Sequence, residues 1–369
     1  MKKRVMSLLI VVAMLISGFT ACGKSEKAGY EIVLVTDKGN IDDKSFNQGS
    51  WEGVLAFAEA NNITHQYYKP EEASDEGYLK AISLAVDGGA KVIVCPGYLL
   101  EVAVYNAQTM FPDIKFILVD GEPHTPDYQY HTEDNVACIK YAEEEAGYLA
   151  GYAAVMEGMR TLGFEGGMAV PAVIAFGLGY LQGIEAASAE LGLEDGSVKV
   201  FYHYTGDFAE TDANKATAKA MFESGAEIIF GCGGAVCKSV FSAASEANGK
   251  TIGVDVNQKA DSETVITSAM KGLGASVQEV LEAIYGGTFD SYAGKTTYFT
   301  AANNGVSLPD DYERFTTFTK EQYDAAYKTL VDGTIDPVRS VETAEENGIA
   351  TAEELAAGLG LKKVVVEIR

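Results

Sequence analysis

Basic residues are scarce in this 369-residue chain, which has 28 lysines and arginines against 53 aspartates and glutamates. The formal net charge is −25, and removal of Lys2, Lys3 and Arg4 with an N-terminal signal (see below) would leave 25 basic residues and a charge of −28. Nucleic-acid phosphates and anionic lipid surfaces attract basic patches on proteins. The negative charge of this chain therefore argues against nucleic-acid binding and against a protein surface that binds anionic lipids. We interpret the acidity as a means of staying soluble at the cell surface.

Motifs of catalysis and metal binding are also missing. The chain has no GxSxG elbow, HExxH pair, Walker lysine or paired redox cysteine motif, and its Gly231–Gly234 segment does not match a GxGxxG dinucleotide fingerprint. Its four histidines do not form a ligand cluster, and we expect two of them, His124 and His131, to be exposed in an irregular loop. The sequence therefore predicts neither an enzyme nor a bound cofactor or metal.

Cysteine is rare as well. Apart from Cys22, the chain contains Cys95, Cys138, Cys232 and Cys237, whose spacing fits no zinc site. A disulfide between Cys232 and Cys237 is possible in an oxidising compartment, but we favour buried free thiols.

The N-terminus has the pattern of a secretory signal. Three basic residues precede an apolar run, Val5–Ile16, which is shorter than the roughly 20 residues that span a bilayer. Small residues then lead to Cys22, as in a bacterial lipobox, although Phe19 stands where Leu is usual. We expect a signal peptide over 1–21 and a lipidated Cys22 at the start of a flexible tether over 22–29. The alternative is an ordinary signal peptide with an incidental cysteine. No later segment looks apolar enough to span a membrane.

Strands and helices alternate along the rest of the chain. Continuous apolar runs such as Ile32–Thr36 predict buried parallel strands, and segments with helical spacing follow them, the first with Ser45 as its expected N-cap. Two such series, each of about 110 residues, predict an α/β protein with two similar lobes, each built on a doubly wound parallel sheet. We expect an irregular segment over 288–320, helices over 320–332 and 351–359, and an edge strand over 363–368.

Polar and small residues gather after the predicted strands. Ligands of open parallel sheets bind beyond the carboxyl ends of the strands. These ends carry Asp37, Gly97, Asp120, Gly166-Gly167, Asp207-Phe208, Gly233-Gly234 and Asp255. Single residues of these kinds also make turns and caps, but seven such ends together favour a binding cleft.

Several motifs carry a family resemblance. The segment Asp37–Gln48 (DKGNIDDKSFNQ) resembles the opening motif of the basic membrane protein lipoproteins, also called purine nucleoside receptor A-type proteins. Further matches are LVD at 118–120, EEEAGYLAGY at 143–152, FEGGM at 164–168, GYLQG at 179–183, IGVDVNQ at 252–258 and TSAMK at 267–271. The resemblance covers roughly residues 30–335.

The resemblance implies a type I periplasmic-binding-protein fold and a nucleoside-binding component of an ABC importer. The implied lobes are discontinuous and joined by a hinge. We expect lobe 1 over 30–135 and about 262–290, lobe 2 over 136–261 and about 291–337, and a C-terminal extension over 338–369. The implied partners are a purine nucleoside (adenosine, guanosine or inosine) and ABC permease subunits. The protein would contact the outer face of the bacterial cell membrane through its lipid anchor alone. We expect the protein to be a monomer.

Carried over by position, the resemblance also implies residue roles. Phe46 and Phe208 would sandwich the base, and Asp37, Asn47 and Asp120 would contact its polar edges or position those contacts. Asp255, Lys271 and the backbone at Gly233 and Gly234 would hold the ribose hydroxyls. Alternatively, Phe46 packs inward at a helix start and Lys271 is a solvated helix end.

The sequence departs from the family pattern at three places. Ala169 replaces a frequent acidic residue, two cysteines enter the turn at 232–237, and Gly272-Leu273-Gly274 follows Lys271 where a more charged stretch is usual. These departures could alter the preference for purines. The alternatives are a sugar or another small metabolite as the ligand, or a ligand sensor without transport as the function.

Overall fold

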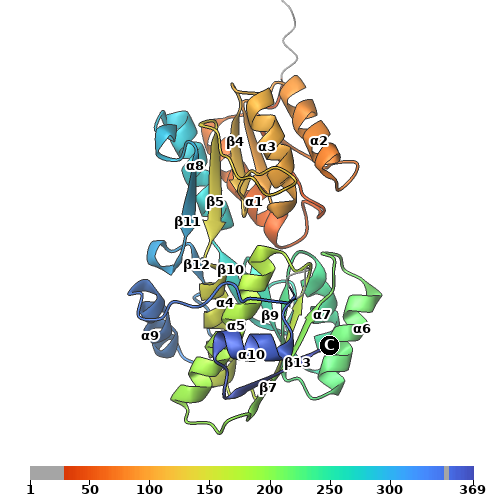
Figure 1. The fold of residues 1–369 in the computed structure, drawn as a ribbon, viewed down its shortest axis with the longest axis vertical. Coiled ribbons are helices and arrows are strands. Elements are labelled where there is room, and N and C mark those ends of the chain that lie inside the picture. Colours follow the sequence, from red (N-terminus) through yellow and green to blue (C-terminus); the bar gives the residue numbers. More distant parts are fainter. Residues whose placement is uncertain (1–28, 345–348) are drawn as a thin grey trace, which may run out of the picture.

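The computed structural model describes residues 29–344 and 349–369 and shows two lobes stacked along the long axis of the molecule (Figure 1). Each lobe is a sheet covered by helices, so the predicted α/β class with two parallel sheets is confirmed. The predicted signal peptide, Cys22 and all of the predicted tether except Gly29 lie outside the described residues.

The sheet of the first lobe has six parallel strands in the order β11-β5-β4-β3-β1-β2. The strands are β1 (Ile32–Val35), β2 (His65–Tyr68), β3 (Val92–Pro96), β4 (Lys115–Val119), β5 (Val136–Tyr141) and β11 (Lys295–Phe299). The helices of this lobe are α1 (Phe46–Asn61), α2 (Asp75–Asp87), α3 (Glu101–Met110) and α8 (Leu273–Gly286), with short 3-10 turns at Tyr98–Leu100 and Phe289–Ser291. Ile32 and Leu34 pack with α1 and α8, whereas Val33 and Val35 pack with α2 and α3, so helices cover both faces.

The sheet of the second lobe has seven strands in the order β12-β10-β9-β8-β6-β7-β13, and only the short β12 is antiparallel among the described residues. The strands are β6 (Thr161–Gly166), β7 (Val198–Tyr204), β8 (Ile228–Cys232), β9 (Lys250–Asp255), β10 (Val265–Lys271), β12 (Val306–Ser307) and β13 (Val364–Ile368). The helices are α4 (Glu143–Met156), α5 (Pro171–Glu190), α6 (Asp212–Glu223), α7 (Val236–Ala247), α9 (Lys320–Val331) and α10 (Ala352–Leu359), with a 3-10 turn at Ala301–Asn303.

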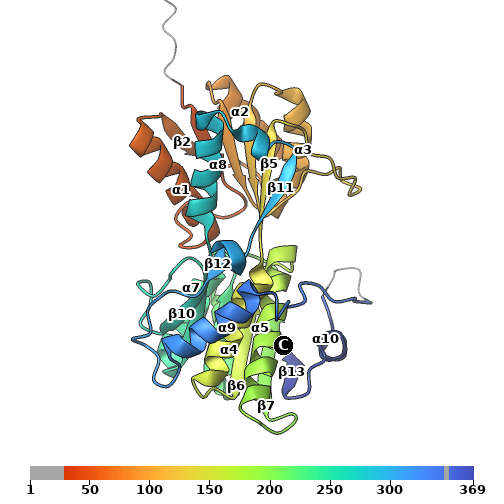
Figure 2. The same ribbon diagram turned by 90° about the vertical axis from the view of Figure 1, so that its left-hand side faces the viewer.

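The chain passes between the lobes three times, at Ala142, at Gly272 and between β11 and β12 (Figure 2). This corrects the predicted lobe boundaries. Residues 136–141 and 295–299 were assigned to lobe 2 but pair in the first sheet, and residues 265–271 were assigned to lobe 1 but pair in the second. A strand belongs to the sheet in which its backbone is paired, and the pattern of side chains does not reveal that partner.

Other expectations have mixed outcomes. The segment 288–320 is not wholly irregular, because it contains β11 and β12, and β10 was not predicted as a strand. The helices near 320–332 and 351–359 and the C-terminal edge strand are confirmed. The extension over 338–369 is thus built into the second lobe through β13. His124 is buried and bonded to Glu101, contrary to expectation, and the four cysteines that follow Cys22 are buried free thiols, as expected.

Helices α4 and α5 pack unusually closely because glycines line their contact. A Cβ atom at any of these positions would lie about 2 Å from a backbone oxygen of the other helix, and they are Gly147, Gly151, Gly179 and Gly183. By length and composition α5 could cross a membrane, contrary to our expectation that no later segment would qualify, but most of it is buried inside the second lobe. It is therefore the core helix of that lobe.

The glycine contact yields a stability prediction. In Gly183→Ala the new Cβ would lie 1.9 Å from the Tyr148 carbonyl oxygen, so the helices must separate. We expect the free energy of unfolding to fall by about 1–3 kcal/mol in urea titrations, as for other overpacked cores. Gly286→Ala is the control, since Gly286 has open space around its Cβ position at the end of α8, and it should be neutral or up to about 1 kcal/mol more stable. Equal destabilisation of both variants would contradict the packing argument.

Candidate functional site

A cavity of about 380 Å³ lies between the lobes, where the carboxyl ends of the strands of both sheets meet. All nine residues predicted to bind a ligand line it: Asp37, Phe46, Asn47, Asp120, Phe208, Gly233, Gly234, Asp255 and Lys271. The first sheet and α1 supply four of them, and the second lobe supplies the rest. The expectation that these residues gather at one cleft is therefore met, while their contacts with a ligand stay a prediction.

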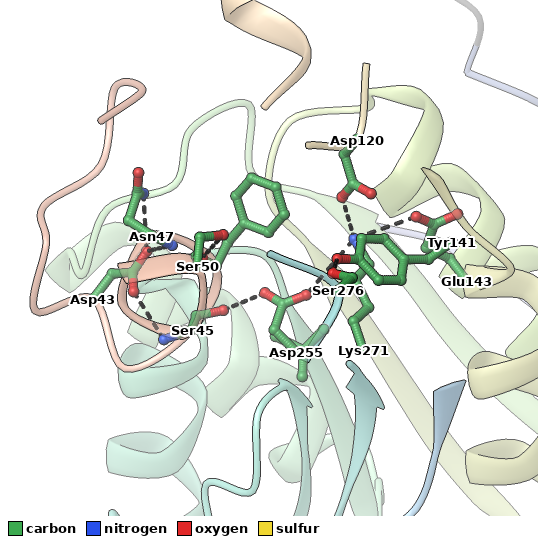
Figure 3. Close-up of polar contacts among 12 residues, drawn as sticks. Asp43, Ser45, Asn47, Ser50, Asp120, Tyr141, Glu143, Asp255, Lys271 and Ser276 are labelled. Atoms are coloured by element: carbon green, nitrogen blue, oxygen red, sulfur yellow. Dashed lines mark hydrogen bonds and ion pairs between the residues drawn. The ribbon is translucent and has the colours of Figure 1, made fainter. Parts of the chain in front are cut away.

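Lys271 is the central cation of this site (Figure 3). It ends β10, and its side chain is only 2% exposed, so it is not a solvated helix end. Its ammonium group donates to the Asp120 carboxylate and lies 3.3 Å from Glu143 Oε1 and 3.8 Å from Asp255 Oδ1. Burial alone would lower the pKa of Lys271, but the carboxylates outweigh burial and raise the pKa well above its ordinary value. The lysine is therefore a fixed positive charge.

The two aspartates beside Lys271 have an unusual backbone. Asp120 follows β4 and Asp255 ends β9, and their φ angles are 57° and 65°, in the left-handed region that few residues other than glycine adopt. Such conformations cost on the order of 1–3 kcal/mol and concentrate at functional sites. Here they turn both carboxylates from the strand ends into the cavity.

A direct bond between the lobes involves Asp255. Its carboxylate accepts a hydrogen bond from the hydroxyl of Ser45, in the first lobe. Burial raises the pKa of Asp255 to about 6, although Lys271 and Ser45 oppose the rise. Ser45 occupies the N-cap position of α1 as predicted, yet its side chain does not cap the helix. The carboxylate of Asp43 instead accepts the backbone N–H groups of Ser45, Asn47 and Gln48, which frees the Ser45 hydroxyl to reach across the cleft.

Asn47 holds other site residues in place. Its amide nitrogen donates to Asp37 Oδ1 at 2.8 Å and to Asp43 Oδ2 at 3.0 Å, so both amide hydrogens are used within the protein. Asp37 Oδ1 also accepts the N–H of Gly39 at 2.7 Å. Burial raises the pKa of Asp37 to about 6, and the bond from Asn47 limits that rise. Asn47 therefore orients Asp37, which fits the positioning role that the sequence left open.

The two predicted aromatic residues come from opposite lobes. Phe46 begins α1, and the ammonium nitrogen of Lys271 lies 5.1 Å from its ring centroid. The ring of Phe208 rests against Gly167 and Gly233, where a Cβ atom would approach ring carbons at 2.5 and 3.1 Å, and Gly234 lies against the Cβ and backbone of Phe208. Gly233 and Gly234 make room for Phe208, and the expectation that their backbone holds a ribose stays a prediction. Their positive φ angles, 117° and 51°, also favour glycine.

The sequence analysis missed several residues around Lys271. Glu143, in the first turn of α4, is 3% exposed, and the rings of Tyr141 and Phe176 lie 5.4 and 5.2 Å from the Lys271 nitrogen. Burial raises the pKa of Glu143 above its ordinary value, although Lys271 opposes this. Acidic residues in the first turn of a helix are common because they interact favourably with the helix dipole. The sequence therefore gives no reason to expect that one of them is buried and paired with a lysine. The EEEAGYLAGY motif was the one available signal.

One carboxylate oxygen in the cavity wall has no partner. Asp120 Oδ2 binds Lys271, but Asp120 Oδ1 is buried and accepts no hydrogen bond within the protein. Leaving a buried acceptor unpaired is unfavourable by about 1–3 kcal/mol, and more when it is charged. A ligand with an N–H or O–H group would relieve this. Among the described residues, no cluster of three metal-ligating side chains occurs.

Comparisons with known proteins agree with this geometry. A family model described as ABC transporter substrate-binding protein PnrA-like matches residues 30–336. The chain is 27% identical to the ABC transporter nucleoside-binding protein BmpA of Lactococcus lactis subsp. cremoris over 91% of this chain and 99% of that protein. It is also 27% identical to an uncharacterized lipoprotein of Pyrococcus abyssi, over 86% of this chain and 79% of that protein.

A solved structure supports the fold. The crystal structure of an ABC transporter solute-binding protein from Aeropyrum pernix K1 superposes with a TM-score of 0.76 at 21% identity, covering 90% of this chain and 99% of that one. The expected periplasmic-binding-protein fold is thus confirmed. Proteins of the matching family bind solutes outside the cytoplasm for ABC transporters and are not enzymes. Because the family model spans most of the sequence, this chain belongs to the family of PnrA-like ABC transporter substrate-binding proteins, the Bmp family.

Proposed function

We propose that this protein is a monomeric, lipid-anchored lipoprotein that captures purine nucleosides in the interlobe cavity and delivers them to an ABC permease. The observation that carries the proposal is the pairing of two aromatic side chains, Phe46 and Phe208, from opposite lobes of one cavity with carboxylates on its walls. A flat base stacks on aromatic rings, and base N–H groups and ribose hydroxyls donate to carboxylates.

The polar groups divide naturally between the two halves of a nucleoside. Asp37, oriented by Asn47, and the unpartnered oxygen of Asp120 would accept from the edge of the base. Asp255 and Lys271 would bind the ribose hydroxyls, one as acceptor and one as donor. The name of the L. lactis relative as a nucleoside-binding protein supports this class of ligand.

Calorimetry and native mass spectrometry test the ligand. Guanosine, adenosine and inosine should each be titrated, with uridine and ribose as controls, and a bound ligand should raise the melting temperature because it binds only the folded state. We expect the purine nucleosides to bind and ribose alone to fail. Binding of ribose without nucleosides would favour a sugar-binding protein, and no binding of any of the three purine nucleosides at millimolar concentration would refute the proposal.

The anchor has a separate test. Intact mass spectrometry of protein from the membrane fraction of its native host should find a mature chain that begins at Cys22 with added acyl groups. Each acyl CH₂ stabilises the membrane-bound state by roughly 0.8 kcal/mol, so Cys22→Ser should release the protein to the medium or soluble fraction. An unmodified mature chain that begins elsewhere would contradict the lipid anchor but leave the nucleoside site untouched. The relatives named as lipoproteins support this part of the proposal.

A further inference from the structure

The C-terminal segment beyond the matched family region reaches Glu143, which in turn contacts Lys271 in the wall of the ligand cavity. It is fastened to the second lobe at both ends: Val338 exchanges two hydrogen bonds of 2.8 Å with the side chain of Gln182 on α5, and β13 pairs with β7 along its whole length (Figure 2). Arg339, next to the first of these anchors, is therefore presented by a held backbone.

Arg339 lies where the chain passes between the lobes. Its guanidinium is 3.3 Å from Glu143 Oε2 and 3.8 Å from Glu144 Oε1, both in the first turn of α4 just after the crossing at Ala142. The same group lies 5.8 Å from the ring centroid of Tyr298 in β11, on the first lobe. The arginine side chain is 36% exposed, whereas that of Glu143 is almost fully buried. The arginine thus covers this buried carboxylate from the solvent side.

Glu143 connects Arg339 to the cavity. One of its oxygens, Oε2, faces Arg339, and the other, Oε1, lies 3.3 Å from the ammonium group of Lys271. Three acidic groups near Glu143 (Asp120, Glu144 and Asp255) disfavour a negative charge on its carboxyl group. Two cations face Glu143 and oppose this effect, Arg339 and Lys271. A buried carboxylate keeps its charge and position only when it is paired.

We propose that Arg339 is a positioning residue for the ligand cavity, which holds Glu143 so that Glu143 in turn holds the ammonium group of Lys271. Without Arg339, Glu143 is free to turn toward solvent, and Lys271 loses one of its three carboxylate partners. The proposal concerns the cavity of the solute-free protein and does not depend on which solute binds.

The test uses the full mature chain without ligand. Brief treatment with acetic anhydride followed by peptide mass spectrometry gives the acetylation rate of Lys271 relative to exposed lysines of the same sample. We expect Lys271 to react several-fold faster in Arg339→Gln than in the wild-type protein. Arg339→Lys should restore most of the protection because it keeps a cation facing Glu143. Arg369→Gln is the matched control, since Arg369 lies over Phe201 at the far end of the same segment, and its Lys271 rate should not change.

A double-mutant cycle separates this mechanism from a loss of stability. If Arg339 acts through Glu143, adding Arg339→Gln to Glu143→Gln should change neither the Lys271 rate nor the affinity further. Guanosine affinity, where guanosine binds, should fall about tenfold in Arg339→Gln, the effect of losing one hydrogen bond to a charged group. An unchanged Lys271 rate in Arg339→Gln, or additive effects in the cycle, would overturn the proposal, whereas failure of guanosine to bind the unmodified protein would count only against the nucleoside assignment.

Discussion

Lys271→Met is expected to lower the free energy of unfolding by about 3–5 kcal/mol at pH 8, because it leaves buried carboxylates without their cation. Lys271 lies within 4 Å of Asp120, Glu143 and Asp255, and all four side chains are almost fully buried. Methionine is similar to lysine in length and fills the space, so the loss reports the charge. Urea unfolding followed by circular dichroism measures it.

The pH dependence of this loss provides its internal check. Burial already raises the pKa of Asp255 to about 6, and removal of Lys271 must raise it further. A carboxyl whose pKa is higher in the folded than in the unfolded state favours folding at low pH, and this contribution disappears as the pH rises through the folded-state pKa. The deficit of Lys271→Met should therefore be smaller at pH 5 than at pH 8. A deficit that does not change with pH would mean that packing, not charge, is responsible.

Lys320→Met is the matched control. Lys320 makes two ion pairs on the surface of α9, with Asp310 and Asp324, and all three side chains are more than half exposed. Surface ion pairs contribute about 0–1 kcal/mol, so this variant should remain close to the unmodified protein at both pH values. If both lysine variants lost the same stability, the buried cluster would have no special role.

Phe46→Ala and Phe208→Ala are each expected to weaken purine nucleoside binding by about 10- to 100-fold. Stacking of a base on an aromatic side chain is worth about 1–3 kcal/mol, and each 1.4 kcal/mol corresponds to a factor of ten in the dissociation constant. Both side chains are only partly buried and line the cavity, so the fold should survive their truncation. Calorimetry with guanosine and the melting temperature of the free protein measure the two effects separately.

Leucine variants distinguish stacking from simple apolar contact. Phe46→Leu and Phe208→Leu keep an apolar side chain but remove the ring. If either leucine variant bound guanosine as tightly as the unmodified protein, the corresponding phenylalanine would be an apolar wall and not a stacking partner. A variant with lower affinity and an unchanged melting temperature of the free protein would agree with the sandwich.

The parts of the fold that the sequence revealed are those in which burial dictates the residue pattern. β1 is buried on both faces and reads as an unbroken apolar run, which is why it was easy to predict. β11 is an edge strand of Lys295, threonines, Tyr298 and Phe299 with only one buried residue, so it gave no such signal. The sheet that β5 or β10 joins depends on pairing with residues far along the chain, which single-segment patterns do not contain.

The candidate site shows the same division. Asp120 and Asp255 were identified because they lie at the carboxyl ends of strands. In every open parallel sheet these ends lie along the same edge, where ligands bind. Glu143 and Arg339 were not identified, because their significance arises from burial at a crossing between the lobes and from a contact between residues 196 positions apart. The contact of Phe208 with Gly233 and Gly234 was not predicted either, because it joins a loop and a strand end that lie apart in the sequence.

The three passages between the lobes also determine when each lobe can be finished as the chain appears from its N-terminus. The first sheet obtains its outer strand β11 only when residue 299 has passed, after most of the second lobe. The second sheet obtains β13 only at residue 368. Proteins usually fold domain by domain from the N-terminus, but here neither half can be completed before the other has largely appeared. The two halves should thus mature together, each waiting for strands that come late in the chain.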